Sequence, residues 1–264
     1  LTEIGYSLEK NYVDNFVVSN EHSRENIFTI PMDKTLYATV FKNLFRTLHY
    51  VHGSALGRGA ENGSSATLST LSTFGYGTPH QDPRFEFNFF ADTVKVDDKV
   101  VMINKTTPLV YHPLSIKMQL TGAKYEKTAG ARMKKYEIDR TAFDDGKLQN
   151  NDIVLYRYAD ALLMRSEALI RQGLNGDKSL NTVRNRVGLP GLTNATLYDV
   201  FKERRLELVW EGTHRQDLIR YGRFHHAYEE RPQLENESNG YTTVFPIPAR
   251  MLQMNHLLKQ NPGY

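Results

Sequence analysis

Residues 157–169 read Arg157-Tyr158-Ala159-Asp160-Ala161-Leu162-Leu163-Met164-Arg165-Ser166-Glu167-Ala168-Leu169, and this stretch decides the fold. It lies within Ile153–Gln172, where apolar residues cover more than one stripe of a helix. A helix with so wide an apolar surface is covered by neighbours on most sides. Gly173 follows at a position that favours a helix end. The pattern therefore predicts a buried helix over Ile153–Gln172.

Further helices are predicted downstream, joined by short connections. One begins at Thr196, whose hydroxyl can cap free amides, with Asp199 in the capping-box position, and it stops at Gly212. Paired helices of this kind indicate repeat-like packing, but no clean period of about 34 residues marks a tetratricopeptide array. The other predicted helices are Lys178–Val187, Arg215–Tyr221 and a last turn from Pro248 through Leu252.

The first 150 residues have a different composition and hold most of the Gly, Ser and Thr. Phe85–Phe89 alternates apolar and polar residues, which is typical of a half-buried strand. Leu36–His49 carries one apolar stripe and is predicted to be a helix. Further short strands are predicted within Val94–Ile103, with a turn at Asp97-Asp98, and at Met133–Ile138.

Composition excludes several classes of protein. The 264 residues include 33 Lys and Arg against 30 Asp and Glu, and a net charge of +3 does not favour nucleic-acid binding. The absence of cysteine excludes disulfide scaffolds, thiolate zinc sites and cysteine nucleophiles. No apolar run approaches the roughly 18–20 residues of a membrane helix. The chain begins at Leu1 with no signal-peptide pattern, which indicates a processed or truncated chain.

A stretch rich in Gly, Ser, Thr and Asn, Gly53–Thr78, shows no periodicity over about 25 residues. A loop of this length inside a compact domain is usually functional or disordered. Aromatic faces stack on the C–H faces of sugars, while amide and guanidinium groups bond to sugar hydroxyls. The alternative is a solvated linker that two aromatic residues anchor to the core. The candidate ligand-binding residues in or just beyond the loop are Arg58, Asn62, Phe74, Tyr76, His80 and Arg84.

The densest polar feature is a charged helix with three carboxylates four residues apart on one face and two arginines beside them. Stacked carboxylates could hold a metal or serve as an acid/base pair. Ion pairs with neighbouring elements are the favoured interpretation. The residues are Glu203, Glu207, Glu211, Arg204 and Arg205.

No motif supports catalysis or a metal site. Glu211-x-x-His214 matches half of a di-iron signature, but the chain has no second Glu-x-x-His pair. His49-x-x-His52 has no acidic third ligand nearby, which favours a structural role or a contact to a ligand from a loop. The glycine pairs around Arg58 and Tyr76 lack the Lys-Ser/Thr of a phosphate loop, and no Gly-x-Ser-x-Gly nucleophile elbow occurs.

Four motifs resemble those of the SusD/RagB family of lipoproteins and occur in the family's order. The first is the Arg157–Leu169 helix. Asp82-Pro83-Arg84 and Lys135-Tyr136 are similar to weaker marks of the same family, so the resemblance extends upstream. The remaining motifs are Asn181–Leu189 (NTVRNRVGL), Lys202–Gly222 (KERRLELVWEGTHRQDLIRYG) and a terminus running from Phe245-Pro246-Ile247-Pro248 to Asn261-Pro262-Gly263-Tyr264.

This resemblance implies a mainly α fold with a minor α+β component, in which tetratricopeptide-like helix pairs carry a loop-rich subdomain. The chain is then expected to divide into a loop-rich region, 1–150, and a helical region, 151–264, intertwined as one domain of a longer protein. The resemblance also implies a lipoprotein on the outer face of the Bacteroidetes outer membrane, a binding protein without cofactor rather than an enzyme. It would capture an oligosaccharide or another nutrient and deliver it to a SusC-like TonB-dependent transporter. A helical-repeat interaction scaffold without carbohydrate affinity remains the alternative.

In this family the matched motifs are framework, and the ligand site lies in variable loops that carry no motif. Family members are longer and begin with a lipobox cysteine, so the chain resembles their C-terminal part, with the anchoring cysteine expected upstream. Gly212-Thr213-His214-Arg215 carries one residue more than the usual pattern, which leaves the start of the following helix open. The resemblance implies buried ion pairs for Arg204, Arg205, Glu207, Glu211, Arg215 and Asp217.

Overall fold

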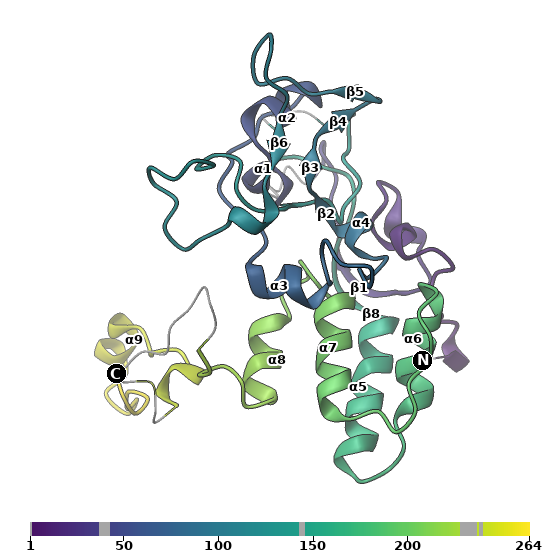
Figure 1. Ribbon diagram of the computed structural model, residues 1–264. Coiled ribbons are helices and arrows are strands. Elements are labelled where there is room, and N and C mark those ends of the chain that lie inside the picture. Colours follow the sequence, from purple (N-terminus) through teal and green to yellow (C-terminus); the bar gives the residue numbers. More distant parts are fainter. Residues whose placement is uncertain (1, 37–42, 143–145, 228–236, 238–239) are drawn as a thin grey trace. The chain divides into compact units, whose positions relative to one another are not determined.

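The computed structural model describes residues 2–36, 43–142, 146–227, 237 and 240–264 (Figure 1). The chain divides into two compact units, Leu1–Gly212 and Thr213–Tyr264. This division does not coincide with the change of composition near residue 150, and the expected regions 1–150 and 151–264 stay a prediction. The fold is mainly α, with short strands in two-stranded sheets.

Three helices form the helical part of Leu1–Gly212: α5 (Tyr158–Arg171), α6 (Asp177–Arg186) and α7 (Leu197–Glu207). They lie side by side, with α5 in contact with both others (Figure 1). The apolar residues that make α5 hydrophobic on more than one stripe explain this packing, because each neighbour covers part of its surface. Their shared core consists of Ala159, Leu163, Leu180, Val183 and Val200.

The predicted helix over Ile153–Gln172 is wrong at its start. Ile153–Arg157 forms strand β8, which pairs antiparallel with β1 (Asn26–Ile30), and α5 begins only at Tyr158. A short apolar run fits a strand as well as a helix, and periodicity alone does not separate the two. The partner strand lies more than a hundred residues earlier in the chain, so no local signal marks it.

The loop-rich part is built from short helices and hairpins. The strand predicted at Phe85–Phe89 is mostly wrong, because Phe85–Asn88 forms the helical turn α4 and only Phe89 enters a strand. The loop predicted at Gly53–Thr78 is also more ordered than expected, since it contains the end of α2 and all of α3. The helices here are α1 (Asn43–Thr47), α2 (Tyr50–Ala55), α3 (Leu68–Thr73) and α4.

One predicted hairpin is confirmed. Asp97 and Asp98, both with left-handed φ, connect β4 to β5. Two consecutive left-handed residues form the tight turn that matches the twist of paired strands. The hairpin strands are β4 (Lys95–Val96) and β5 (Lys99–Val100). Two further strand pairs are β2 (Phe89–Phe90) with β7 (Arg132–Met133) and β3 (Asp92–Thr93) with β6 (Val110–Tyr111).

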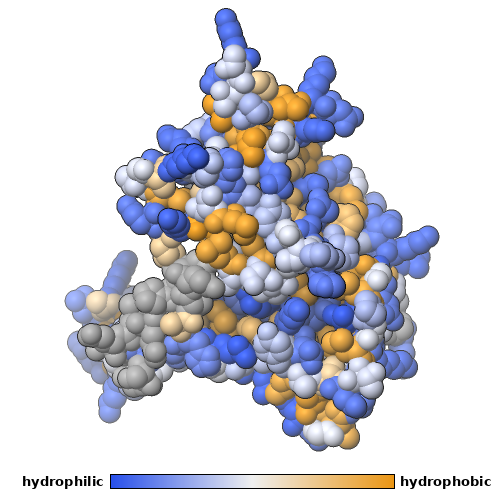
Figure 2. Space-filling model, in the orientation of Figure 1, coloured by the Kyte–Doolittle hydropathy of each residue, from blue (hydrophilic) through white to orange (hydrophobic). Residues whose placement is uncertain are grey.

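Two predicted elements differ in extent from those observed. Of the strand predicted at Met133–Ile138, only Met133 is in a strand, as the second residue of β7. Of the helix predicted at Leu36–His49, Asn43–Thr47 is α1, and residues 37–42 lie outside the described residues. Apolar side chains reach the surface around the β4–β5 hairpin, where Figure 2 shows orange atoms among blue ones. They include Val100, Met102 and Ile103, each about two fifths exposed.

Two apolar clusters join the loop-rich part to the helices of the same unit. In one, Leu206 of α7 packs with Phe74, Phe85 and Phe89. In the other, Val154 of β8 packs with residues of the N-terminal and β7 segments, among them Tyr12, Phe16, Met133 and Tyr136. The half-buried ring of Trp210 contacts both clusters. Leu1–Gly212 therefore has a core made by both of its compositional halves.

The unit Thr213–Tyr264 contains α8 (His214–Arg220) and α9 (Ala249–Met254). Arg215 holds it together, because its guanidinium lies 4.3 Å from the ring centroid of Phe245 and donates to the Thr242 carbonyl at 3.1 Å. The Tyr264 hydroxyl donates to the Val244 carbonyl at 2.9 Å. Among the described residues of the chain, no helix is long and apolar enough to cross a membrane.

Candidate functional site

A groove of about 590 Å³ opens in the loop-rich part beside the loop that follows α3. Its walls come from α4, from strands β2 to β4 and from single side chains of other segments. We call it the Tyr76 groove. It is lined by Tyr76, Gly77, Gln81, Phe85, Glu86, Phe89, Phe90, Ala91, Asp92, Thr93, Val94, Lys95, Leu114 and Lys134.

Tyr76 is placed at this groove by the end of α3. Gly75 takes a left-handed φ of 64°, and the Tyr76 amide donates back to the Leu71 carbonyl at 3.0 Å. This arrangement closes the helix and directs the next residue outward. A Cβ on Gly75 would come within 3.1 Å of the His80 carbonyl oxygen, so the loop folds back too closely for a larger residue.

The Tyr76 side chain has one face in the core and its hydroxyl in the groove. Its ring stacks on that of Phe85, with 4.8 Å between centroids. Its hydroxyl donates to both carboxylate oxygens of Asp92, at 2.8 and 3.0 Å. Partial burial and this carboxylate raise the pKa of Tyr76, so the phenol stays protonated at neutral pH.

Polar side chains at the groove are partly tied to one another. The Gln81 amide nitrogen donates to a Glu86 carboxylate oxygen at 3.1 Å, and the Lys134 ammonium donates to the Glu86 carbonyl at 2.8 Å. Lys134 also lies 5.6 Å from the ring centroid of Phe90. Carboxylate, amide and ammonium groups thus border half-buried aromatic rings. An open groove of this kind suits a ligand that has apolar faces and many hydroxyls.

Of the six predicted ligand residues, two are buried away from solvent. Phe74 is 1% exposed and packs edge-to-face against Phe89, with 5.1 Å between centroids. Arg84 is fully buried and donates to three carboxylates. Neither side chain lines the Tyr76 groove. Both are part of the buried structure beneath Tyr76 and not of the groove surface.

The other three lie apart from the groove. Arg58 lines a separate cavity near α2. The Asn62 amide donates to the Lys127 carbonyl at 2.8 Å and accepts from Arg132 at 3.0 Å, so it fastens two loops together. His80 is exposed but does not line the groove.

Sequence reasoning missed Glu86, Asp92 and Lys134. The alternation in Phe85–Phe89 did place Glu86 among exposed positions, which is the one signal that could have selected it. Asp92 takes a left-handed φ of 56°, and only the fold reveals that its carboxylate meets Tyr76. Lys134 reaches the groove through the pairing of β2 with β7, which connects segments more than 40 residues apart.

Behind the groove lies a buried ion network that joins both parts of Leu1–Gly212. Arg84 donates to Glu203 at 2.7 Å and to Glu207 at 2.9 Å. Arg157 donates to Glu25 at 2.7 Å and to Glu207 at 2.6 Å. Each charge has an opposite charge beside it, as burial of ions requires. The network consists of Glu25, Asp82, Glu203, Glu207, Glu211, Arg84, Lys135, Arg157, Arg184 and Arg186.

The pKa values in this network follow from burial and from these partners. Burial opposes ionisation of Glu207, but Arg186, Arg157 and Arg84 hold the pKa of that carboxyl well below its usual value. The pKa of Glu211 is lowered in the same way by Arg157 and Lys135. Burial lowers the pKa of Lys135 to about 8, although Glu211 acts in the opposite direction. The network is therefore ionised and structural.

The remaining residues of the expected ion-pair framework have varied contacts. Arg204 donates to Asp160 of α5 at 2.6 Å, and Arg205 donates to the Ser69 carbonyl at 3.1 Å. In the C-terminal unit, Asp217 accepts from Arg220 at 2.7 Å. Arg215 contacts carbonyls and aromatic rings as described above.

The two histidines of the His49-x-x-His52 pair are arranged around Tyr111. The His49 ring accepts from the Val51 amide at the start of α2, and a ring nitrogen of His52 lies 3.1 Å from the Tyr111 hydroxyl. Burial lowers the pKa of His52 to about 4, with His49 adding to the effect. Both rings support the loop-rich part. Within the described ranges, no three His, Asp or Glu residues are grouped so as to hold a metal ion.

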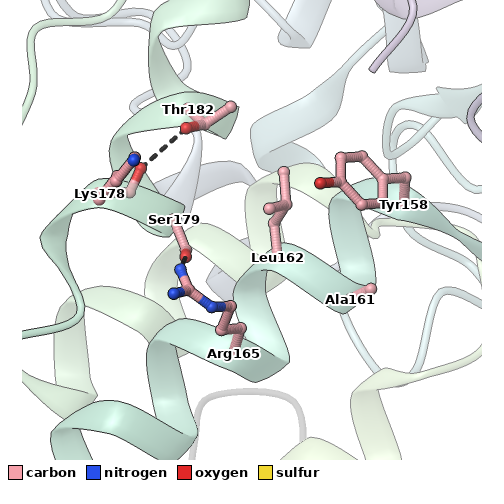
Figure 3. A pocket seen from close by; sticks show the side chains of 7 residues that line it. All are labelled: Tyr158, Ala161, Leu162, Arg165, Lys178, Ser179 and Thr182. Carbon is pink, nitrogen blue, oxygen red and sulfur yellow. Dashed lines mark hydrogen bonds between the residues drawn. The ribbon is translucent and has the colours of Figure 1, made fainter. Parts of the chain in front are cut away.

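A further cavity, of about 500 Å³, lies along α5 and α6 (Figure 3). Its polar groups bond mostly to each other. Arg165 donates to the Ser179 hydroxyl at 2.7 Å, and the Thr182 hydroxyl donates to the Lys178 carbonyl at 2.8 Å. The view shows Leu162 and Tyr158 on the α5 side of the cavity. The first contact joins α5 to α6 and the second lies within α6. Because these polar groups already bond to the protein, the cavity is a weaker candidate for ligand binding than the Tyr76 groove.

Two curated relatives of this chain are named SusD or SusD-like. Over 135 residues the chain is 29% identical to the starch-binding protein SusD of Bacteroides thetaiotaomicron, which covers 49% of this chain and 24% of that protein. It is 30% identical over 135 residues to the SusD-like protein P38 of Formosa agariphila, covering 44% of this chain and 25% of that protein. The matched region is thus about a quarter of each of these relatives.

Solved structures match over nearly the whole chain. A SusD-like protein from Bacteroides fragilis matches with a TM-score of 0.71 and 18% identity, over 100% of this chain and 60% of that one. A surface glycan-binding protein A from Bacteroides thetaiotaomicron, in complex with laminarihexaose, matches with a TM-score of 0.65 and 19% identity, over 97% of this chain and 56% of that one. The SusD family model matches residues 5–264. The resemblance inferred from four motifs is therefore confirmed, and the chain belongs to the SusD family.

Proposed function

We propose that this chain is part of a cell-surface protein that binds oligosaccharides through the Tyr76 groove. The observation that carries the proposal is the groove itself, in which a stacked tyrosine borders exposed carboxylate, amide and ammonium groups. Family membership supports it, because one relative is named a starch-binding protein and another was solved with laminarihexaose. The absence of a catalytic motif in the sequence agrees with a binding protein and not an enzyme.

The remaining parts of the proposal concern the whole protein. We propose that it resides on the outer membrane of a Bacteroidetes cell through a lipid on a cysteine upstream of Leu1. There it would pass captured oligosaccharide to a SusC-like TonB-dependent transporter. Support comes from membership of the SusD family. The chain spans only part of the length of its relatives, so these statements are proposed for the whole protein.

The test is isothermal titration calorimetry of the chain with laminarihexaose and with a maltooligosaccharide. We expect Tyr76→Ala to weaken binding about tenfold, because an aromatic anchor at the centre of an interface typically contributes more than about 1 kcal/mol. Tyr76→Phe keeps the ring and loses only the bond to Asp92, so it should bind with intermediate affinity.

The matched control is Tyr198→Ala, which removes an exposed tyrosine from α7 that does not line the groove. It should bind like the unmodified chain. If Tyr76→Ala bound oligosaccharide with unchanged affinity, the binding site would not be the Tyr76 groove. No carbohydrate binding at all, together with co-purification of a protein partner, would favour the interaction scaffold instead.

A further inference from the structure

A second cavity of the loop-rich part, about 560 Å³ in volume, shares no lining residue with the Tyr76 groove. It lies where α2 runs into a glycine-rich turn. Its lining combines one aromatic ring, one hydroxyl and one charged group with a wall of very small residues. We call it the Arg58 pocket, and it is lined by Tyr50, Ser54, Gly57, Arg58, Gly59, Ala60 and Gly146.

Arg58 is buried here with two nitrogen atoms unused. Arg58 is only 8% exposed, and its Nη2 donates to the Gly146 carbonyl. Its Nε and Nη1 have no hydrogen-bond partner within the part of the chain that the structure describes. Arg84 and Arg157 have comparable burial but donate to several carboxylates each. A buried guanidinium without an anion is costly, so Arg58 differs from the structural arginines.

The described residues at the Arg58 pocket include two cationic groups, Arg58 in the lining and Lys127 beside Tyr50. Of the described acidic groups, the one that acts on Arg58 is Asp139, whose carboxylate already accepts from Thr141 and Asn150. The Lys127 ammonium lies 5.9 Å from the ring centroid of Tyr50, at the other side of the lining. Guanidinium groups stay protonated at neutral pH. Among the described residues, the pocket therefore has a guanidinium in its lining and an ammonium beside the tyrosine ring that lines it.

Glycines bring the backbone close around the guanidinium. Gly146 has a left-handed φ of 75°, and a Cβ there would lie 2.5 Å from the Gly59 carbonyl oxygen and 3.2 Å from the Arg58 Nε. A Cβ on Gly53 would lie 2.7 Å from that of Ala60. Any larger side chain at these positions would displace the turn or cover Arg58. The small residues of the wall therefore let the backbone pack closely against the Arg58 side chain.

We infer that the Arg58 pocket binds an acidic group on the glycan, either the carboxylate of a uronic acid or a sulfate ester. Arg58 supplies the charged hydrogen bonds, the Ser54 hydroxyl a further one, and the half-exposed Tyr50 ring a face for the sugar. Charge-assisted bonds of this kind are about twice as strong as neutral ones. This inference rests on the proposed carbohydrate-binding function and adds to it the class of sugar.

The experiment compares four probes on the chain by calorimetry: laminarihexaose, a sulfated laminarihexaose, an oligogalacturonide and sodium sulfate. The expected result is at least tenfold tighter binding of one acidic oligosaccharide than of the neutral one. Arg58→Met should abolish that difference, and Arg58→Lys should restore part of it. The sulfated and uronic probes distinguish the two sources of the negative charge.

The matched control is Arg140→Met, which removes an equal charge from an exposed pair with Asp97. It should leave the preference for acidic sugars intact. Arg58→Met should also unfold at the same temperature as the unmodified chain or a higher one, because it removes a buried charge without a partner. A lower melting temperature together with an unchanged preference would make Arg58 structural and overturn the inference.

The two proposals fail differently. Equal binding of neutral and acidic sugars, lost only in Tyr76→Ala, would overturn the acidic-group inference and leave the Tyr76 groove standing. If no oligosaccharide binds but sulfate raises the melting temperature of the chain and not of Arg58→Met, the anion site is supported and the carbohydrate function is overturned.

Discussion

At the scale of single residues, similar side chains have opposite roles. Arg58 and Arg84 were both candidates for ligand contact, since each lies in or next to the same glycine-rich stretch. Arg84 instead meets Glu203 and Glu207, which lie 119 and 123 residues later. Arg58 meets no carboxylate in the described chain. The partners of a charged residue are set by the fold, so local sequence could not separate the two.

The buried carboxylates predict a loss of stability in acid. The pKa of Glu211 is lower folded than unfolded, so the unfolded chain binds a proton first as pH falls. The stabilisation is complete above the unfolded value, near 4.3, and is lost as pH falls through the lower folded value. Urea denaturation at pH 7 and at pH 4, followed by Trp210 fluorescence, measures it.

A matched variant isolates this contribution from that of other acids. Glu211→Gln cannot ionise, so its free energy of unfolding should depend less on pH than that of the unmodified chain. Glu61→Gln removes an exposed carboxylate whose partner Arg46 is 3.6 Å away, and it should keep the full dependence. The same pH dependence in all three would show that the pKa of Glu211 is the same in the folded and the unfolded chain.

At the scale of elements, predictions were best where the signal is local. The capping box at Thr196 placed the start of α7, and both of its hydrogen bonds are present in the structure. The Asp97-Asp98 turn was also recovered. Phe85–Asn88 was misread because an alternation over five residues also fits one helical turn packed on a core. β8 was missed because its partner β1 is remote.

The capping box makes a prediction about α7. The Thr196 hydroxyl accepts from the Asp199 amide, and the Asp199 carboxylate accepts from the Thr196 amide at 2.8 Å. We expect Thr196→Ala to lower the free energy of unfolding by about 1 kcal/mol, the typical value of a lost N-cap. Thr182→Ala is the control, since that hydroxyl only bonds to the Lys178 carbonyl within α6. If Thr196→Ala and Thr182→Ala lowered the free energy of unfolding equally in urea denaturation, Thr196 would not stabilise α7 as an N-cap.

At the scale of the molecule, family and fold class followed from sequence, while the site followed only in part. Three of the four motifs include residues of α5, α6 and α7, the helices that pack against one another in Leu1–Gly212. Tyr76 was selected because the long loop combines aromatic rings with side chains that form hydrogen bonds. Its polar neighbours come from other segments, Asp92 from β3 and Lys134 from the residue that follows β7. A binding surface assembled from separate loops has no sequence pattern of its own.

The buried network predicts that both compositional halves of Leu1–Gly212 unfold together. Glu207 bonds to Arg84 of the loop-rich part and to Arg157 at the start of α5. The Trp210 indole donates to the Asn88 carbonyl at 3.1 Å, a second link between the halves. Hydrogen exchange followed by mass spectrometry measures the opening free energies of α3 and α7 separately. The slowest amides of both helices should share one value.

Glu207→Gln sharpens this test, because it leaves buried arginines short of a negative charge. We expect it to lower the opening free energy of α3 and of α7 by the same amount, about 3–5 kcal/mol, as breaking a buried ion pair does. Glu61→Gln, on the exposed surface, should lower neither by more than about 1 kcal/mol. If α7 alone were affected, the halves would be independent domains, and the boundary near residue 150 would be a true domain boundary. A shared loss would make the network the element that joins the binding loops to the helices.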